Sequence, residues 1–273
     1  MSKSLRSRIR MTIFSPAMLL SILAGLFLLL WFHVRSYIGY VNHHGWTKAS
    51  LNLAYVFLDD IYMAQSLNVY CLFSPILAVL PAAAAFCDDY NSGYIRAILV
   101  RVDKKRYARE CLICSTISGG LALLIPCLIV TLLFIAGGHL NTGSAWNHSG
   151  YSTVFDSTVY SQIQYIWDGV FLALLLILLA FLFGAFWSNA GLVISAFFPN
   201  KYAVLAAPFA MYFAQHLFLY KSDTLIVFSM NNIMMPAGEF IPYAAFPFVY
   251  QTIWLIVVAL VYRWAMGRRL SDV

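Results

Sequence analysis

Residues 169–198 read GVFLALLLILLAFLFGAFWSNAGLVISAFF, a run of 30 residues without a single charged side chain. A helix that crosses the ~30 Å hydrocarbon core of a bilayer needs roughly 20 residues, because each residue adds about 1.5 Å. As one helix this block would reach about 45 Å, so it must tilt, protrude or break. We predict the break at Trp187-Ser188-Asn189-Ala190-Gly191, where small and polar residues interrupt the apolar run.

Five further apolar blocks are long enough to span a membrane. Of the 273 residues, 62% are hydrophobic and only 10% are charged, whereas a soluble domain carries about 25% charged residues. This composition excludes a two-domain soluble enzyme. We predict an all-α integral membrane protein, with residues 1–273 forming one domain of six transmembrane helices. The expected spans are 16–34, 67–87, 111–136, 169–198, 202–220 and 248–262.

The basic residues are distributed unevenly between the two sides of this arrangement. On one side lie 14 of the 17 Lys and Arg residues: Lys3, Arg6, Arg8, Arg10, Arg96, Arg101, Lys104, Lys105, Arg106, Arg109, Lys201, Arg263, Arg268 and Arg269. Cytoplasmic loops are enriched in Lys and Arg, so we expect both termini in the cytoplasm. The net charge of +6 then indicates membrane orientation and not a nucleic-acid partner.

The segments expected on the outer side carry amphipathic patterns. Residues 146–167 repeat apolar side chains at helical spacing, and residues 51–62 do so less regularly, which predicts helices lying in the outer interface. Pro236, Pro242 and Pro247 interrupt an apolar run before the last span and suggest a partly re-entrant turn. These segments either cap the bundle or form an outer vestibule or gate.

Motifs for catalysis, nucleotide binding and metal binding are missing from the sequence. It contains no G-x-x-x-x-G-K-[ST], H-E-x-x-H or G-x-S-x-G pattern. His216 is the one titratable residue expected well inside a span, and Cys111-x-x-Cys114 has no second pair with which to bind a metal. An intramembrane enzyme is therefore disfavoured, and any transport must take its energy from another chain.

The loop between the second and third spans, residues 88–107, is the most informative stretch. Asp88 and Asp89 precede a short helical run, where they would suit the positive end of the helix dipole. An apolar stripe follows, flanked by Arg96 and Arg101; it consists of Tyr94, Ile95, Ile98 and Leu99. A short amphipathic helix of this kind fits a groove in a soluble partner. The alternative is a solvated basic loop, which would need neither Gly93 nor the stripe.

This loop resembles the first cytoplasmic loop of ABC type-2 permeases, the membrane subunits of type V ABC exporters. The matching positions are Asp89, Gly93, Leu99, Arg106 and Tyr107. The resemblance extends to six spans with cytoplasmic termini, a broken segment between the last two spans, and an N-terminal amphipathic elbow helix. The elbow corresponds to residues 1–15, with Arg6, Arg8 and Arg10 on its polar side. Glu110 departs from the family pattern, in which many members carry Lys.

The resemblance implies a transport subunit, not an enzyme, in a bacterial cell membrane. A separate cytoplasmic ATPase would bind ATP and Mg, so no cofactor is expected in this chain. A second permease chain, identical or paralogous, would complete the pathway for a peptide, lipid or drug. The alternative is a non-transporting membrane scaffold or immunity subunit.

The residues expected to contact the ATPase form one set in the loop. In it Gly93 would allow close backbone approach, Tyr94, Ile98 and Leu99 would fill a groove, and the arginines would pair with acidic groups. The complete set is Asp89, Gly93, Tyr94, Arg96, Ile98, Leu99, Arg101, Lys105, Arg106 and Tyr107.

Overall fold

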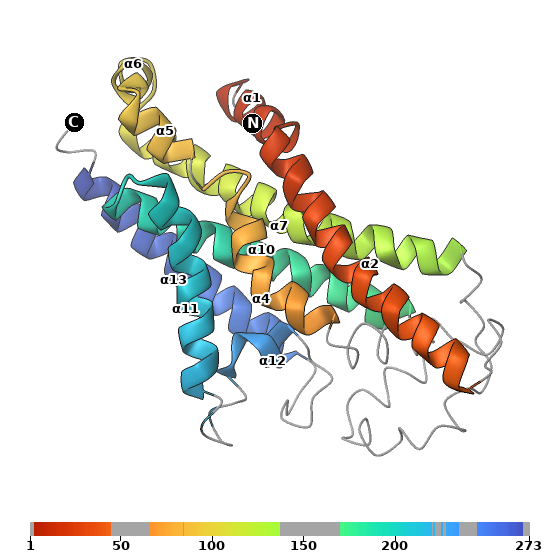
Figure 1. The fold of residues 1–273 in the computed structure, drawn as a ribbon. Coiled ribbons are helices and arrows are strands. Elements are labelled where there is room, and N and C mark those ends of the chain that lie inside the picture. Colours follow the sequence, from red (N-terminus) through yellow and green to blue (C-terminus); the bar gives the residue numbers. More distant parts are fainter. Residues whose placement is uncertain are drawn as a thin grey trace.

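The computed structural model describes residues 3–44, 66–83, 85–136, 170–219, 221, 225, 228–234 and 245–269. Within these ranges the fold is built from α-helices and contains no β-strand. In chain order the helices are α1 (Lys3–Ile13), α2 (Pro16–His44), α4 (Ser66–Val79), α5 (Ala85–Asn91), α6 (Tyr94–Leu99), α7 (Lys104–Ala136), α10 (Val170–Phe197), α11 (Lys201–Leu219), α12 (Met230–Met234) and α13 (Phe246–Arg269) (Figure 1).

Four of these helices are long and apolar enough to cross a membrane, and they are α7, α10, α11 and α13. A fifth span results if α1 and α2, which meet at an angle of 46°, are counted as one bent pair. The prediction of an all-α fold is confirmed for the described residues, and several of their helices could span a membrane.

The expected span 67–87 is divided into two helices. α4 has 14 residues and ends at Val79, a turn covers residues 80–83, and α5 begins at Ala85. Pro81 accounts for the interruption, because proline lacks an N–H group and disfavours the helical conformation of the residue before it. At about 1.5 Å per residue, α4 alone is roughly 21 Å long and shorter than a hydrocarbon core.

The predicted break in the fourth span is wrong, because α10 is one continuous helix of 28 residues. The small and polar residues expected to interrupt it pack against α7 instead. Ser188 hydrogen-bonds Ser115 across 2.8 Å, and Asn189 Nδ2 donates to Thr116 Oγ1 at 2.8 Å. Gly184 lies so close to α7 that an added Cβ would come within 2.2 Å of a backbone oxygen there.

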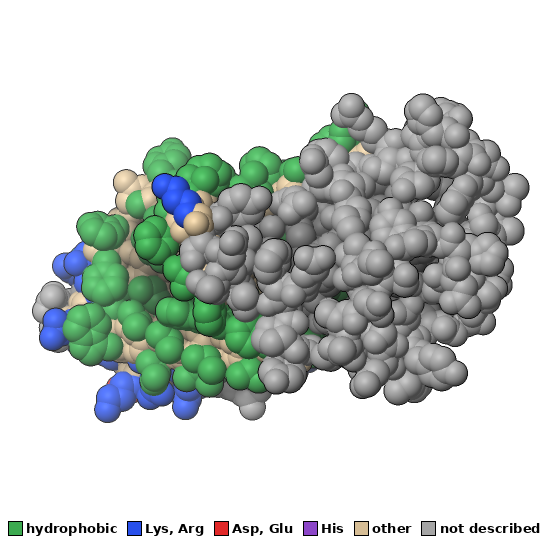
Figure 2. Space-filling model, turned by 90° about the horizontal axis from the view of Figure 1, so that it is seen from below, with side chains coloured by type: hydrophobic (Ala, Val, Ile, Leu, Met, Phe, Trp, Pro, Cys, Tyr) green, Lys and Arg blue, Asp and Glu red, His purple; other side chains and the backbone are tan. Residues whose placement is uncertain are grey.

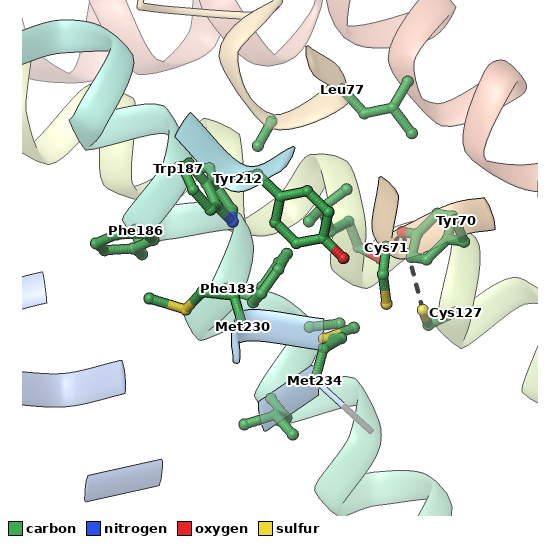
Figure 3. Packing of buried hydrophobic residues seen from close by; sticks show 14 of the residues in the cluster. Tyr70, Cys71, Leu77, Cys127, Phe183, Phe186, Trp187, Tyr212, Met230 and Met234 are labelled. Carbon is green, nitrogen blue, oxygen red and sulfur yellow. Dashed lines mark hydrogen bonds between the residues drawn. The ribbon is translucent and has the colours of Figure 1, made fainter. Parts of the chain in front are cut away.

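α10 is the most buried of the long helices and organises the core, with α7, α13, α4 and α11 packed around it. Phe183 and Trp187 of α10 meet Tyr212 of α11 edge to face, with ring centroids 6.4 and 5.8 Å apart (Figure 3). On the other side of this cluster, Tyr70 of α4 donates to the Leu123 carbonyl of α7 at 2.9 Å. Aromatic packing thus joins α10 to α11, and a tyrosine hydrogen bond joins α4 to α7.

The N-terminal region contains the expected short helix followed by a bend. Ser15 caps α2, because its Oγ accepts a hydrogen bond from the Met18 amide at 3.1 Å, and Pro16 occupies the first helical position. The bend lets α1 leave the direction of α2 and lie against α7. An elbow geometry therefore follows from a local Ser-Pro signal.

Several predictions for the outer segments concern residues beyond those described. The expected interfacial helices at 51–62 and 146–167 lie outside the described ranges, as do Pro236 and Pro242. Pro247 lies in the first turn of α13, where a proline is tolerated. His216 is in the last turn of α11, not well inside a span, and its Nδ1 lies 3.3 Å from Ser229 Oγ.

One end of the bundle carries α1, α5, α6, the start of α7 and the end of α13 (Figure 1). We call it the basic end, after its described basic residues: Arg6, Arg8, Arg10, Arg96, Arg101, Lys104, Lys105, Arg106, Arg109, Lys201, Arg263, Arg268 and Arg269. In Figure 2 apolar side chains cover most of the described surface, and Lys and Arg gather mainly at its left and lower margins. This surface suits a protein with apolar sides in lipid and one basic face in water.

Candidate functional site: the α5–α6 segment

The α5–α6 segment, residues 85–101, stands at the basic end and owes its sharp turn to Gly93. Ser92 Oγ donates to the Asp88 carbonyl at 2.6 Å, which closes the end of α5. Gly93 then adopts a φ of 73° and serves as the N-cap of α6. A Cβ built on Gly93 would meet nothing within 4 Å, so within this chain the glycine is required by its left-handed backbone and not by close packing.

Asp89 ties this segment to α1 and α7. It lies on α5, where it accepts a 2.8 Å hydrogen bond from Tyr107 Oη and pairs with Arg8 Nη2 at 3.3 Å. The Arg8 guanidinium also lies over the Tyr107 ring, 4.8 Å from its centroid. The expectation that Asp88 and Asp89 serve the dipole of the short helix is wrong, because both lie within α5 and bind other elements.

The charge on Arg8 is maintained despite its partial burial. Burial alone would lower its pKa, but the electrostatic influence of Cys111, Tyr107 and Asp89 raises the pKa above the ordinary value for arginine. Arg8 therefore stays positively charged at any physiological pH.

α5 has further contacts with α11 and α13. Asp88 forms an ion pair with Lys201 at the start of α11. Asn91 Nδ2 donates to the Pro199 carbonyl at 2.9 Å, and the Arg269 guanidinium of α13 lies 4.7 Å from the centroid of the Tyr90 ring. One short helix thus contacts four other helices through polar side chains.

The buried and exposed faces of α6 consist of different residues from those that the predicted apolar stripe assigned to them. Ile95 is only 2% exposed, and Ile98 and Leu99 pack partly buried against the same cluster, which includes Phe86 and Tyr107. Ile98 and Leu99, which were predicted to fill a groove in the partner, thus bury part of their surface against their own bundle, and their role towards a partner stays a prediction.

The outer face of α6 consists of other residues. Tyr94 is 60% exposed and Val100 is 88% exposed, and Arg96, Ala97 and Arg101 lie on the surface with them. This face combines two large apolar side chains with two guanidinium groups, and Tyr94, Ala97 and Arg101 also border the space between α6, α1 and α7.

The start of α7 follows a capping pattern that positions the remaining predicted residues. Asp103 Oδ2 accepts a hydrogen bond from the Lys105 amide at 3.2 Å, as an N-cap does. Arg106 Nε lies 3.2 Å from Glu110 Oε1, one helical turn further on. Lys105 and Arg106 are exposed, whereas Tyr107 is 1% exposed and faces Asp89.

Arg8 is the functional residue that sequence reasoning placed incorrectly. Arg6 and Arg10 are exposed, but Arg8 lies about 200° around the helix from each and faces α5 and α7. Its Nη1 also reaches Cys111 Sγ at 3.5 Å. The two-residue spacing of the three arginines was the available signal, because such residues cannot share one helix face.

The five cysteines are buried free thiols, in agreement with a packing role. Cys114 faces α1 one turn beyond Cys111, with its Sγ 3.2 Å from Thr12 Oγ1. Among the described residues no group of three or more His, Cys, Asp or Glu side chains could hold a metal ion.

Comparison with family models, curated proteins and solved structures gives no match to this chain. The functional argument therefore depends on the geometry of the α5–α6 segment and on its sequence pattern.

Proposed function

We propose that this chain is the membrane-spanning permease subunit of an ATP-driven exporter of the ABC type-2 class. In this proposal the outer face of α6 seats in a separate cytoplasmic ATPase, and a second permease chain completes the pathway. The chain would lie in a bacterial cell membrane with both termini in the cytoplasm. The observation that carries the proposal is that α5–α6 has a free outer face while its inner side contacts four helices.

The outer face of α6 has the composition of a docking surface. Large side chains that are exposed in the free protein supply most of the binding energy in protein interfaces, with Tyr and Arg prominent among them. Tyr94 and Val100 would enter the ATPase groove, and Arg96 would pair with an acidic group at its rim. The ATPase would hold ATP and Mg, so this chain needs no cofactor.

The inner contacts of α5 provide a route for movement from that surface into the membrane. A displacement of α6 moves α5 through the short turn at Gly93. α5 then pulls on α1 and α7 through Asp89, and on α11 through Asp88. Closure of the ATPases on ATP would by this means rotate the permease helices and open the pathway for an amphipathic or hydrophobic cargo.

A matched pair of tyrosine substitutions tests the docking surface. Tyr94 and Tyr202 are 60% and 84% exposed, and only Tyr94 lies on α6. We expect Tyr94→Ala to lower the amount of ATPase subunit that co-purifies in mild detergent by fivefold or more, as for the loss of an interface residue worth above about 1 kcal/mol. Tyr202→Ala should retain the wild-type amount.

The ATPase would be identified by mass spectrometry as a soluble subunit carrying a G-x-x-x-x-G-K-[ST] motif. Equal retention by the two variants would refute the role of α6. A wild-type preparation that never retains such a subunit would refute the exporter proposal and favour the membrane scaffold or immunity subunit.

A further inference from the structure

A pocket of ≈ 500 Å³ lies at the basic end, between α1, α6 and the start of α7. Its volume is in the range of about 300–1,000 Å³ that is usual for small-molecule sites. Most of its lining is apolar and comes from five helices and the turn after α6; this lining includes Met11, Phe86, Ala97, Ile98, Val102 and Leu192. The space can therefore accept a hydrocarbon group.

The polar groups of the pocket leave one positive charge uncompensated. Arg8 is paired with Asp89, and Glu110 is paired with Arg106. Arg101 also lines the pocket, and its side chain has no hydrogen bond or ion pair with any residue that the structure describes. An apolar lining with one free guanidinium is complementary to an amphiphile with an anionic head.

The position of the pocket identifies the source of such an amphiphile. α1 forms one wall, and its exposed Met11 and Phe14 lie close to the exposed cations Arg6 and Arg10. A helix with this pattern lies where lipid headgroups meet hydrocarbon. α7, which lines the opposite side, begins with exposed basic residues and continues into an apolar span. The pocket is thus at headgroup depth.

We propose that this pocket binds an anionic phospholipid, with its phosphate at Arg101 and the upper part of one acyl chain against the apolar lining. A guanidinium binds phosphate oxygens through two parallel hydrogen bonds. A zwitterionic lipid is disfavoured, because its ammonium group would enter the field of the surrounding basic residues, among them Lys104 and Lys105. The bound lipid contacts α1 and α6 together and holds the α5–α6 segment in place. This inference does not depend on the identity of any ATPase or cargo.

Native mass spectrometry of the purified chain in detergent measures this binding directly. The probes are dioleoyl phosphatidylglycerol and dioleoyl phosphatidylcholine, which share their acyl chains and differ in net charge. We expect the wild type to retain phosphatidylglycerol at least fivefold better. Arg101→Ala should lose about fivefold in phosphatidylglycerol binding, as for one basic residue acting on an anionic lipid.

Two control variants separate the pocket from general surface charge. Arg96→Ala removes the same charge from the same α5–α6 segment without altering the pocket lining, so it should bind phosphatidylglycerol like the wild type. Ala97→Trp fills the pocket and should abolish the preference. Equal losses in Arg96→Ala and Arg101→Ala, or equal binding of the two lipids by the wild type, would overturn the proposal.

Thermal unfolding with added probes distinguishes a lipid site from a site for free phosphate. Phosphatidylglycerol should raise the unfolding temperature of the wild type and not that of Arg101→Ala. Inorganic phosphate at the same concentration should leave both unchanged. An equal rise with inorganic phosphate would assign the pocket to a free anion and refute the lipid.

Discussion

The closest contact between α7 and α10 makes Gly184→Ala a strong test of the fold. A Cβ added at Gly184 would lie 2.2 Å from the Gly119 carbonyl oxygen and 3.0 Å from its carbonyl carbon. Ordinary van der Waals contact begins near 3.4 Å, so the two backbones would have to separate by roughly 1.2 Å. Both obstacles are backbone atoms, so rotation of a side chain cannot relieve them.

The loss of unfolding free energy in Gly184→Ala has two parts that can be estimated separately. Overpacking of a tight core by one methyl group costs about 1–3 kcal/mol. The separation also stretches the Ser115–Ser188 and Thr116–Asn189 hydrogen bonds, both 2.8 Å long, and interhelical hydrogen bonds in membranes contribute about 0.6 kcal/mol each. We therefore expect Gly184→Ala to lower the free energy of unfolding by about 2–4 kcal/mol.

The assay is equilibrium unfolding in mixed micelles, followed by circular dichroism. Gly267→Ala is the matched control, because a Cβ at Gly267 in α13 would meet nothing within 4 Å. Gly267→Ala should not lower the free energy of unfolding and should raise it by up to about 1 kcal/mol, because alanine has a higher helix propensity than glycine. If Gly184→Ala is as stable as Gly267→Ala, the α7–α10 contact described here is incorrect.

Three further predictions concern the α5–α6 segment and the core. Gly93→Val should cost about 2 kcal/mol in local backbone energy and abolish ATPase co-purification, while membrane insertion stays normal. Gly93→Asn should retain most of the ATPase co-purification, because asparagine tolerates a positive φ. Equal effects of the two substitutions would refute the backbone argument. Asp89→Asn should loosen α1 and raise the maleimide reactivity of Cys111 severalfold, while Asp88→Asn leaves it unchanged; equal reactivity in the two variants would contradict this. Gln251→Leu should leave stability unchanged or raise it by about 1 kcal/mol in the unfolding assay, because both polar atoms of the buried Gln251 side chain lack a partner among the residues that the structure describes. A large loss would refute this.

The presence of apolar helices long enough to span a membrane was predictable because it depends on local composition alone. A block such as 169–198 needs no knowledge of its neighbours to be assigned to lipid. The division of the second block at Pro81 was not readable from that residue alone, because Pro75, Pro126 and Pro208 lie inside α4, α7 and α11 without ending them.

The continuity of α10 was not predictable in the same way. Small and polar residues such as Ser188 and Asn189 either interrupt a helix or pack it against another, and the outcome depends on the facing residues. Here Ser115 and Thr116 of α7 supply the partners, and they lie 73 residues away in the sequence. Local pattern carries no information about that pairing.

The contacts of the candidate site were also only partly predictable from local sequence. The loop pattern singled out Asp89 and Tyr107, and the structure brings them together. Arg8 completes the contact from 81 residues earlier in the chain, so only its helical spacing hinted that it faces inward. The outer face of α6 was assigned by hydrophobicity, but Ile98 and Leu99 turn towards their own bundle and leave Tyr94 and Val100 outside.

The glycine contact between α7 and α10 also limits how this protein can change shape. Two helices separated by side chains can slide by small rotamer changes, but here the backbones of Gly119 and Gly184 touch without side chains between them. Axial sliding would drive a carbonyl oxygen into a Cα atom, so α7 and α10 move as one rigid body. α11 and α13, which are far less buried, are then the parts that can swing relative to this pair. Backbone amides of α7 and α10 should accordingly exchange with deuterium at the rate of global unfolding, and those of α11 and α13 much sooner.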